Sequence, residues 1–206
     1  MTTTMRLVLV LFLSLLSSAC TQAETFTGKV VRVLDGDTAE VLDATNTVHR
    51  IRFSGIDAPE KDQPFGMKAK QELLALIGGR VVDVEWYKLD VHKRRIGKVT
   101  VDGQDVGLAM VRAGFAWWYV AYAKEQQPAD RGLYQAAEAA ARAAGLGLWR
   151  DPAPVAPWDW RHAQKAPGPV AACPCGTEGA ICTGPKGGRF CVTESGDKHY
   201  LRKAEQ

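Results

Sequence analysis

Four acidic side chains lie close to the ends of apolar, strand-like segments of the sequence. They occur in pairs, in "LDGDT" and "RFSGIDAPE", and are Asp35, Asp37, Asp57 and Glu60. If consecutive strands are adjacent, Asp37 and Asp57 lie side by side at one end of a sheet. Two carboxylates that close repel each other unless a cation lies between them. Hard oxygen ligands of this kind suit Ca²⁺, so the spacing indicates a calcium site.

Two arginines on strand-like segments supply the opposite charge. Arg52 and Arg94 can each present a planar fork of N–H donors to a phosphate. Glu60 follows the rigid Pro59 and can accept a proton from water. A cation, two arginines and a base are the groups that phosphodiester hydrolysis needs, because positive charge around phosphorus stabilises the negative charge that gathers there. Each residue alone has an ordinary structural explanation, and only the ordered set indicates catalysis.

These residues are positioned by a predicted series of short strands and helices. Alternating, β-branched residues predict strands at 26–34, 38–43, 47–56, 80–89 and 96–101. Apolar spacing and helix-forming residues predict helices within 66–80, 104–114 and 128–147. Five strands with a helix between the third and the fourth is the element order of an OB-fold barrel. The predicted class is therefore mainly β, with about three added helices.

The charge balance argues against a surface coated for nucleic-acid binding. The chain of 206 residues has a formal net charge of +3. Residues 24–160 contain 18 Lys and Arg against 19 Asp and Glu, whereas residues 161–206 contain seven against four. Any anion site in the main domain must therefore be local. With 46% hydrophobic residues, the chain can form one core and a small appendage.

The first 23 residues have the layout of a signal peptide, with one early arginine, an apolar run and then small residues. Cleavage after Ala23 gives an exported protein, either periplasmic or secreted. Cleavage after Ala19 would instead leave Cys20 at the new terminus, where a lipid could anchor a lipoprotein to a membrane. We expect plain export, because Ser17 stands where a lipobox usually has leucine.

The other four cysteines lie near the C-terminal end and are Cys173, Cys175, Cys182 and Cys191. In an oxidising compartment they predict two disulfides, with three pairings open. Four thiolates could also bind one zinc ion, although "CPC" lacks the usual spacing. The predicted organisation is a signal peptide (1–23), an OB-fold domain (24–161), a Pro- and Ala-rich linker (162–172) and a cysteine-rich basic tail (173–206).

Six motifs follow one another within residues 26–161: "LDGDT", "RFSGIDAPE", "HKRRIG", "GLAMVRAGFAW", "AAGLGLW" and "PWDWR". In this ordered set the sequence resembles the staphylococcal nuclease (thermonuclease) family. The resemblance implies an OB-fold with added helices and a Ca²⁺-dependent phosphodiesterase that acts on DNA, RNA or both. It also implies cleavage of the bond to the 5′ oxygen, with little sequence preference.

The resemblance assigns four residues to the metal site, and Thr38, next to Asp37, is a further supporting candidate. Asp37 and Asp57 match the two metal carboxylates. Ala58 stands where the family's nuclease supplies a backbone carbonyl to the metal. Asp35 matches a supporting carboxylate, and Thr38 completes the same turn.

Three further residues match the catalytic groups. Glu60 matches the general base that activates water, and Arg52 and Arg94 match the two phosphate-binding arginines. Arg95 is adjacent to Arg94, but counting back from "VDG" places Arg94 at the catalytic position. Because side chains alternate between the two faces of a strand, only one of the two can point at a site at the barrel end.

The residues expected to contact a nucleotide depart from the family's best-known member. His92 and Lys93 replace the Tyr-Gly pair that precedes the arginine there, although His92 can also stack on a base. Tyr119 and Tyr122 follow the second predicted helix, near where the family has base-contacting tyrosines. They either contact a nucleotide or pack at the rim of the core.

The resulting hypothesis is an exported, monomeric, Ca²⁺-dependent nuclease whose partner is DNA or RNA, with no protein partner implied. Two alternatives stay open. One is a non-catalytic OB-fold module that binds nucleic acid, and the other is a cell-surface protein whose function resides in the tail. The tail itself either gathers polyanions such as DNA or stabilises the domain as a cap.

Overall fold

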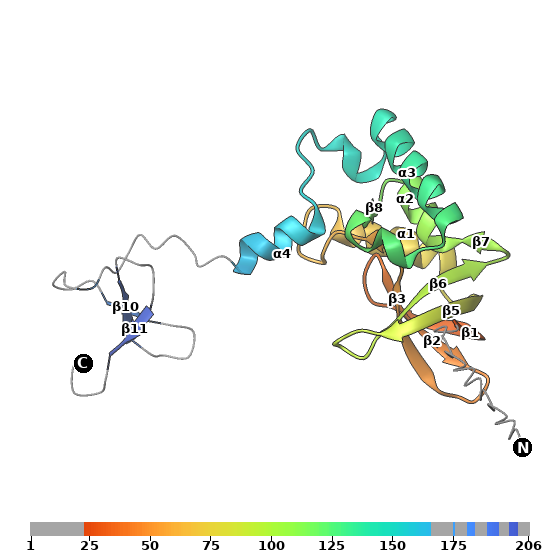
Figure 1. Ribbon diagram of the computed structural model, residues 1–206, viewed down its shortest axis with the longest axis horizontal. Coiled ribbons are helices and arrows are strands. Elements are labelled where there is room, and N and C mark those ends of the chain that lie inside the picture. Colours follow the sequence, from red (N-terminus) through yellow and green to blue (C-terminus); the bar gives the residue numbers. More distant parts are fainter. Residues whose placement is uncertain (1–22, 166–174, 176–180, 184–188, 194–197, 202–206) are drawn as a thin grey trace, which may run out of the picture.

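Five strands form a closed barrel in the computed structural model, which describes residues 23–165, 175, 181–183, 189–193 and 198–201. They are β1 (Glu24–Val33), β2 (Thr38–Asp43), β3 (Val48–Phe53), β5 (Val81–Leu89) and β6 (Arg95–Val101). The strands pair in the order β3-β2-β1-β5-β6, and β3 also pairs with β6, in parallel, which closes the sheet (Figure 1). The predicted five-stranded OB-fold barrel is confirmed.

Apolar side chains at alternate strand positions fill the barrel. In β1, Val30 and Val33 are both buried; a bulge between Val30 and Arg32 shifts the register, so that Val33 lies three positions after Val30 instead of two. Val84 and Val99 meet across the β5–β6 pair and are each 1% exposed. Burying one such side chain stabilises the fold by roughly 1.5–3 kcal/mol.

Four helices accompany the barrel: α1 (Gly66–Ile77), α2 (Val106–Arg112), α3 (Pro128–Ala143) and α4 (Pro157–Lys165). The first lies between β3 and β5 in sequence, as predicted, and buries Ala69, Leu73 and Ile77. Figure 1 shows α1, α2 and α3 gathered at one end of the barrel. Two 3₁₀ segments, η1 (Val120–Glu125) and η2 (Gly147–Arg150), and a short strand β7 (Gln104–Asp105) complete the connections.

The third predicted strand, 47–56, is divided in the structure. It forms β3 and a separate short strand, β4 (Ile56–Asp57), which pairs with β8 (Trp117–Trp118). The division occurs at Gly55, whose φ of +76° is accessible to glycine at little cost. A Cβ there would lie 2.0 Å from the Gln126 side chain, so both the backbone and the packing require glycine.

Helix α4 was not predicted, and it overlaps the start of the predicted linker. The helix continues to Lys165, so the first four residues of the linker expected at 162–172 are helical. Pro157 is the first helical residue, a position that suits proline because its missing N–H is not needed there. The remainder of that linker lies outside the described residues, as do residues 1–22 of the expected signal peptide.

The C-terminal tail contains a disulfide between Cys175 and Cys191. Three short strands form a sheet in the order β11-β10-β9: β9 (Cys182–Thr183), β10 (Arg189–Val192) and β11 (Lys198–Tyr200). Cys182 is disulfide-bonded as well. The disulfide interpretation is therefore confirmed for these cysteines, and the zinc alternative is wrong for them, because sulfur atoms bonded to each other are not thiolate ligands.

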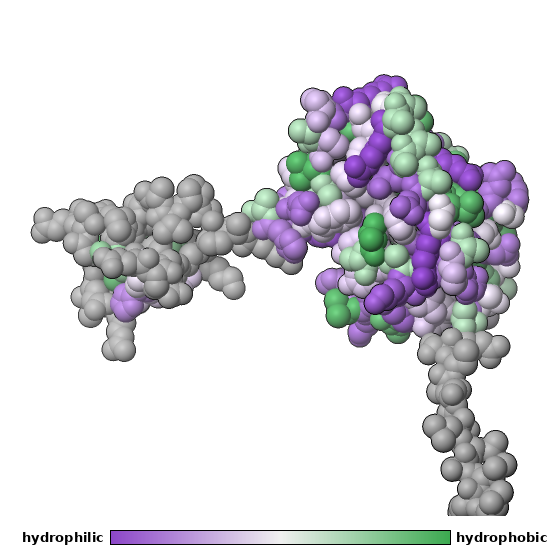
Figure 2. Space-filling view, turned by 45° about the horizontal axis from the view of Figure 1, so that its top comes forward, coloured by the Kyte–Doolittle hydropathy of each residue, from purple (hydrophilic) through white to green (hydrophobic). Residues whose placement is uncertain are grey.

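The surface of the barrel domain is mixed in character. In the face seen in Figure 2, hydrophobic residues occur in small groups among hydrophilic ones. No helix in the described part of the chain combines the length and the apolar composition that crossing a membrane requires.

Candidate active site

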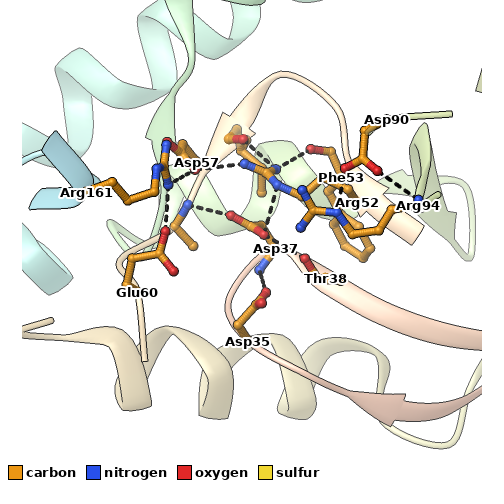
Figure 3. A network of polar contacts seen from close by, with 12 residues as sticks. Asp35, Asp37, Thr38, Arg52, Phe53, Asp57, Glu60, Asp90, Arg94 and Arg161 are labelled. Carbon is orange, nitrogen blue, oxygen red and sulfur yellow. Dashed lines mark hydrogen bonds and ion pairs between the residues drawn. The ribbon is translucent and has the colours of Figure 1, made fainter. Parts of the chain in front are cut away.

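Asp37 and Asp57 lie close together at one end of the barrel, joined by a single guanidinium group. Arg52, on β3, contacts Asp37 Oδ1 from Nε at 3.1 Å and Asp57 Oδ1 from Nη2 at 2.8 Å (Figure 3). The side chains of Asp37 and Asp57 are only 8% and 2% exposed. The meeting of these two carboxylates, expected from their positions at strand ends, is thus present in the structure.

The turn between β1 and β2 positions Asp37. Its Oδ1 accepts a hydrogen bond from the Thr38 hydroxyl at 2.9 Å, and its Oδ2 accepts one from the Ala58 N–H at 2.8 Å. Gly36 allows this close approach, because a Cβ at Gly36 would lie 2.6 Å from Ala58 Cβ and 2.7 Å from Ala69 Cβ. The turn therefore fixes Asp37 through both of its oxygens.

Asp35 supports the turn and adds negative charge to the cluster. Its Oδ1 accepts a hydrogen bond from the Asp37 N–H at 3.1 Å. Burial raises the pKa of Asp35 to about 7, and repulsion from Asp37 adds to the shift. Burial also raises the pKa of Asp57, although Arg161 and Arg52 oppose that shift. The cluster therefore holds more negative charge than it readily stabilises.

Arg52 is largely committed to this cluster. Its Nη1 donates to the carbonyls of Phe53 and Ile56, both at 2.8 Å, in addition to the contacts with Asp37 and Asp57. Burial opposes its charge, but attraction from the aspartates outweighs burial and raises its pKa. Of the five N–H groups of the guanidinium, three donate hydrogen bonds and Nε is ion-paired with Asp37, which leaves one Nη2 N–H without a partner among the described residues.

Arg94 and Arg95 diverge at the start of β6. Arg94 Nε donates to Asp90 Oδ2 at 2.6 Å, and its side chain extends toward Arg52 in Figure 3. Within the described ranges, no hydrogen bond involves its two terminal nitrogens. Arg95 instead contacts His49 Nδ1 at 2.5 Å and lies over the Trp86 ring. Of the two, Arg94 is the one that extends toward Arg52, and its catalytic role stays a prediction.

Glu60 is paired with an arginine that was not among the predicted site residues. Arg161, on α4, donates from Nη1 to Glu60 Oε1 at 2.6 Å and from Nη2 to Asp57 Oδ2 at 2.7 Å. The Glu60 side chain is 38% exposed and can meet solvent water. The one available signal was the last residue of the "PWDWR" motif, which assigns no role by itself.

Comparison with known proteins places the sequence in a family. A family profile described as "Staphylococcal nuclease homologue" matches residues 50–151. An "Uncharacterized endonuclease" of Escherichia coli O157:H7 is 45% identical over 136 residues, which cover 66% of this chain and 84% of that protein. The chain belongs to the staphylococcal nuclease family.

Two further relatives have similar coverage. A "Micrococcal nuclease" of Shigella flexneri is 40% identical over 149 residues, covering 68% of this chain and 83% of that protein. An "Uncharacterized endonuclease" of Haemophilus influenzae is 36% identical over 148 residues, covering 72% and 79%. The matched profile includes Arg52, Asp57, Glu60 and Arg94, whereas Asp37 and Arg161 lie outside it.

The tyrosines that this family member presents near the site are not equivalent. The Tyr119 ring stacks on Trp158, with centroids 5.2 Å apart and planes 8° apart, and it also contacts Tyr122 at 4.9 Å. The face of Tyr119 against Trp158 is therefore closed to a base. Tyr122 is 46% exposed, and His92 is exposed in the β5–β6 turn. Contacts of these residues with a nucleotide stay a prediction.

The donor set fits a hard cation. Within the residues that the structure describes, no group of three or more His, Cys, Asp and Glu side chains is arranged to hold a metal ion. Asp37 and Asp57 nevertheless form a buried carboxylate pair that requires positive charge. Their oxygens, the carbonyl of Ala58, which directly follows Asp57 in sequence, and water are the ligand types that Ca²⁺ accepts.

Proposed function

We propose that this chain is an exported, Ca²⁺-dependent nuclease that hydrolyses phosphodiester bonds of DNA, RNA or both. The observation that carries the proposal is the cluster itself, in which Asp37, Asp57 and Glu60 gather at one end of the barrel with arginines between them. Membership of the staphylococcal nuclease family supports the nuclease activity.

Asp37, Asp57 and the carbonyl of Ala58 are the residues that would hold Ca²⁺, which would supply positive charge against the charge that develops on the phosphate. The protein holds these ligands ready by ordinary hydrogen bonds. Thr38 and the Ala58 N–H fix Asp37, and Arg52 and Arg161 fix Asp57. The two carboxylates are thus held in fixed positions, and a cation at Asp57 would share its oxygens with Arg52 and Arg161.

Glu60 acts as the general base. Its carboxylate is partly exposed, so it can accept a proton from a water molecule that attacks phosphorus. Pro59 precedes it, and the Glu60 N–H donates to Gln63 Oε1 at 3.1 Å, which fixes the backbone there. By family resemblance, the bond that breaks is the one to the 5′ oxygen.

Arg94 and Arg52 bind the phosphate and stabilise its charge. Arg94 has both terminal nitrogens available, and its Nε is held by Asp90, so its fork is already oriented. Arg52 contributes its one uncommitted N–H and a positive charge that the aspartates sustain. Donors placed before the reaction at the position where charge develops lower the barrier.

Export is proposed from the first 23 residues, with lipid anchoring through Cys20 as the alternative. The Cys175–Cys191 disulfide supports export, because disulfides persist in oxidising compartments. Whether the tail gathers nucleic acid is a separate proposal. A protein lacking residues 166–206 would keep the barrel and α4, and an unchanged salt dependence of DNA affinity would exclude that role.

The proposal is tested by digestion of plasmid DNA and of RNA by the purified protein with Ca²⁺, with excess chelator, and with Ca²⁺ restored. We expect cleavage only when Ca²⁺ is present. Full cleavage in excess chelator would contradict the metal role. Binding of single strands without cleavage under every condition would favour the non-catalytic module instead.

A further inference from the structure

The loop that carries Glu60 is held at three points by residues 155–164, which include most of α4. Gln63 Nε2 donates to the Val155 carbonyl at 2.6 Å, and Gln164 Nε2 donates to Asp62 Oδ2 at 3.1 Å. Between these two contacts, Arg161 donates to Glu60 itself. These partners are separated by about a hundred residues in sequence, so the loop geometry depends on the packing of α4.

Helix α4 is also anchored by aromatic contacts outside that loop. Trp158 lies one turn before Arg161 and contacts Trp117 with ring centroids 5.7 Å apart, in addition to its stack on Tyr119. Ala156 and Pro157 at the start of the helix are buried. The helix therefore presents Arg161 from a fixed position on the barrel domain.

Arg161 joins the metal site to the base. Its guanidinium reaches Asp57 Oδ2 at 2.7 Å and Asp57 Oδ1 at 3.3 Å, while the same Nη1 reaches Glu60 Oε1 at 2.6 Å. Since Arg52 also donates to Asp57 Oδ1, both oxygens of Asp57 are occupied by arginine N–H groups. Glu60 is the more exposed of the two carboxylates, and Arg161 is its side-chain partner in the cluster.

We propose that Arg161 is a positioning residue, which holds the Glu60 carboxylate beside Asp57 and whose charge competes with a cation for Asp57. The effect on the rate rests on the proposed nuclease function. Removing Arg161 should change the rate and the cation affinity in opposite directions. Removal of Arg161 lowers the rate, because Glu60 is no longer oriented, but it strengthens cation binding at Asp57, because a like charge is removed. General loss of structure would weaken both.

The test compares Arg161→Ala, Arg161→Lys and the wild type, with Arg150→Ala as the matched control. Arg150 is an exposed arginine on η2 that takes no part in the cluster. The full chain is used throughout. The measurements are kcat and KM on DNA, calorimetric titration with CaCl₂ in the absence of nucleic acid, and the thermal unfolding midpoint.

For Arg161→Ala we expect kcat to fall by about 10- to 100-fold, the effect of a misplaced base. We expect KM to change by less than about threefold, because ground-state binding is retained. Ca²⁺ binding should tighten by about two- to fivefold, the effect of removing one partly exposed charge. Arg161→Lys, which keeps the charge, should restore part of kcat and keep wild-type Ca²⁺ affinity. Arg150→Ala should match the wild type in every measurement.

A wild-type kcat in Arg161→Ala would overturn the positioning role. A lower kcat together with weaker Ca²⁺ binding and a lower unfolding midpoint would also overturn it, because that combination indicates a structural role. If the wild type itself fails to cleave, the proposed function falls. The calorimetric comparison still decides in that case whether Arg161 competes with the cation, so the two failures are distinguishable.

Discussion

Arg94 and Arg95 are neighbours in sequence, yet their guanidinium groups contact different parts of the barrel. Arg94 pairs with Asp90 beside the candidate active site, and Arg95 contacts His49 and Trp86. This follows from the alternation of side chains at the start of a strand. Substituting each residue in turn therefore separates effects on catalysis from effects on stability.

Arg94→Ala should reduce kcat by about 100- to 1,000-fold, the loss measured when one preorganised donor to a developing charge is removed. The thermal unfolding midpoint should stay close to that of the wild type, because the Arg94 side chain is partly exposed. Steady-state cleavage of DNA and a thermal scan of the same sample measure both quantities.

Arg95→Ala is expected to give the reverse pattern. Loss of the contact with Trp86 and of the bond to His49 should lower the free energy of unfolding by about 1 kcal/mol. Activity should stay within a few-fold of the wild type. An inactive but stable Arg95→Ala protein would assign the catalytic position to Arg95 instead.

Gly36→Ala should disturb the metal site through packing. The added methyl group would press on Ala58 and Ala69, so we expect unfolding to become easier by about 1–3 kcal/mol, as in other overpacked cores. Ca²⁺ affinity should fall as well, because the contact between Asp37 and the Ala58 N–H is displaced. Calorimetric Ca²⁺ titration and denaturant unfolding test the two effects.

Gly132→Ala is the matched control for that substitution. Gly132 is exposed within α3, and a Cβ there meets nothing within 4 Å. Alanine should therefore stabilise the protein by about 0.5–1 kcal/mol by favouring the helix, with unchanged Ca²⁺ affinity. Equal destabilisation by both substitutions would show that the tight approach at Gly36 is unimportant.

The stack between Trp158 and Tyr119 should matter for the Glu60 loop. Trp158→Ala removes the main aromatic contact of α4, so we expect faster amide hydrogen exchange in residues 58–65 and a kcat reduced as in Arg161→Ala. Trp158→Phe retains a ring, so its amide exchange in residues 58–65 and its kcat should both stay close to those of the wild type. Unchanged exchange in Trp158→Ala would mean that the loop keeps its geometry without α4.

Asp43 offers a test of pH dependence away from the active site. Its hydrogen bond with His49, followed by those from Thr45 and Thr47, lowers the pKa of the Asp43 carboxyl. A lowered pKa means that the ionised group stabilises the fold above its ordinary pKa near 4, and that this contribution is lost as the pH falls. Asp43→Asn should therefore lower the unfolding midpoint at pH 7, and the difference should shrink at pH 3. A constant difference would assign the effect to packing.

The barrel and the meeting of Asp37 with Asp57 could be predicted, because both depend on local patterns. Alternating apolar residues define the strands, and the antiparallel pairing of β2 with β3 brings the turn before β2, with Asp37, near the end of β3, shortly before Asp57. The break at Gly55 was not predicted, and the neighbour that excludes a larger residue there is the Gln126 side chain, which is distant in sequence.

Arg161 could not be placed from sequence for a similar reason. Its contact with Asp57 joins residues 104 positions apart and depends on how Trp158 docks on Tyr119. No periodicity or spacing encodes that docking. The same docking closes one face of Tyr119, so one ring face of this candidate nucleotide contact is covered by a tryptophan.

The most direct test of the proposed catalysis is single-turnover cleavage of a short DNA by Glu60→Gln at saturating Ca²⁺. We predict a rate at least about 100-fold below that of the wild type, with Ca²⁺ still bound, because glutamine cannot accept the proton from water. Glu85→Gln, at an exposed position of β5, should cleave at the wild-type rate. Cleavage by Glu60→Gln at the wild-type rate would contradict the role of Glu60 as the base.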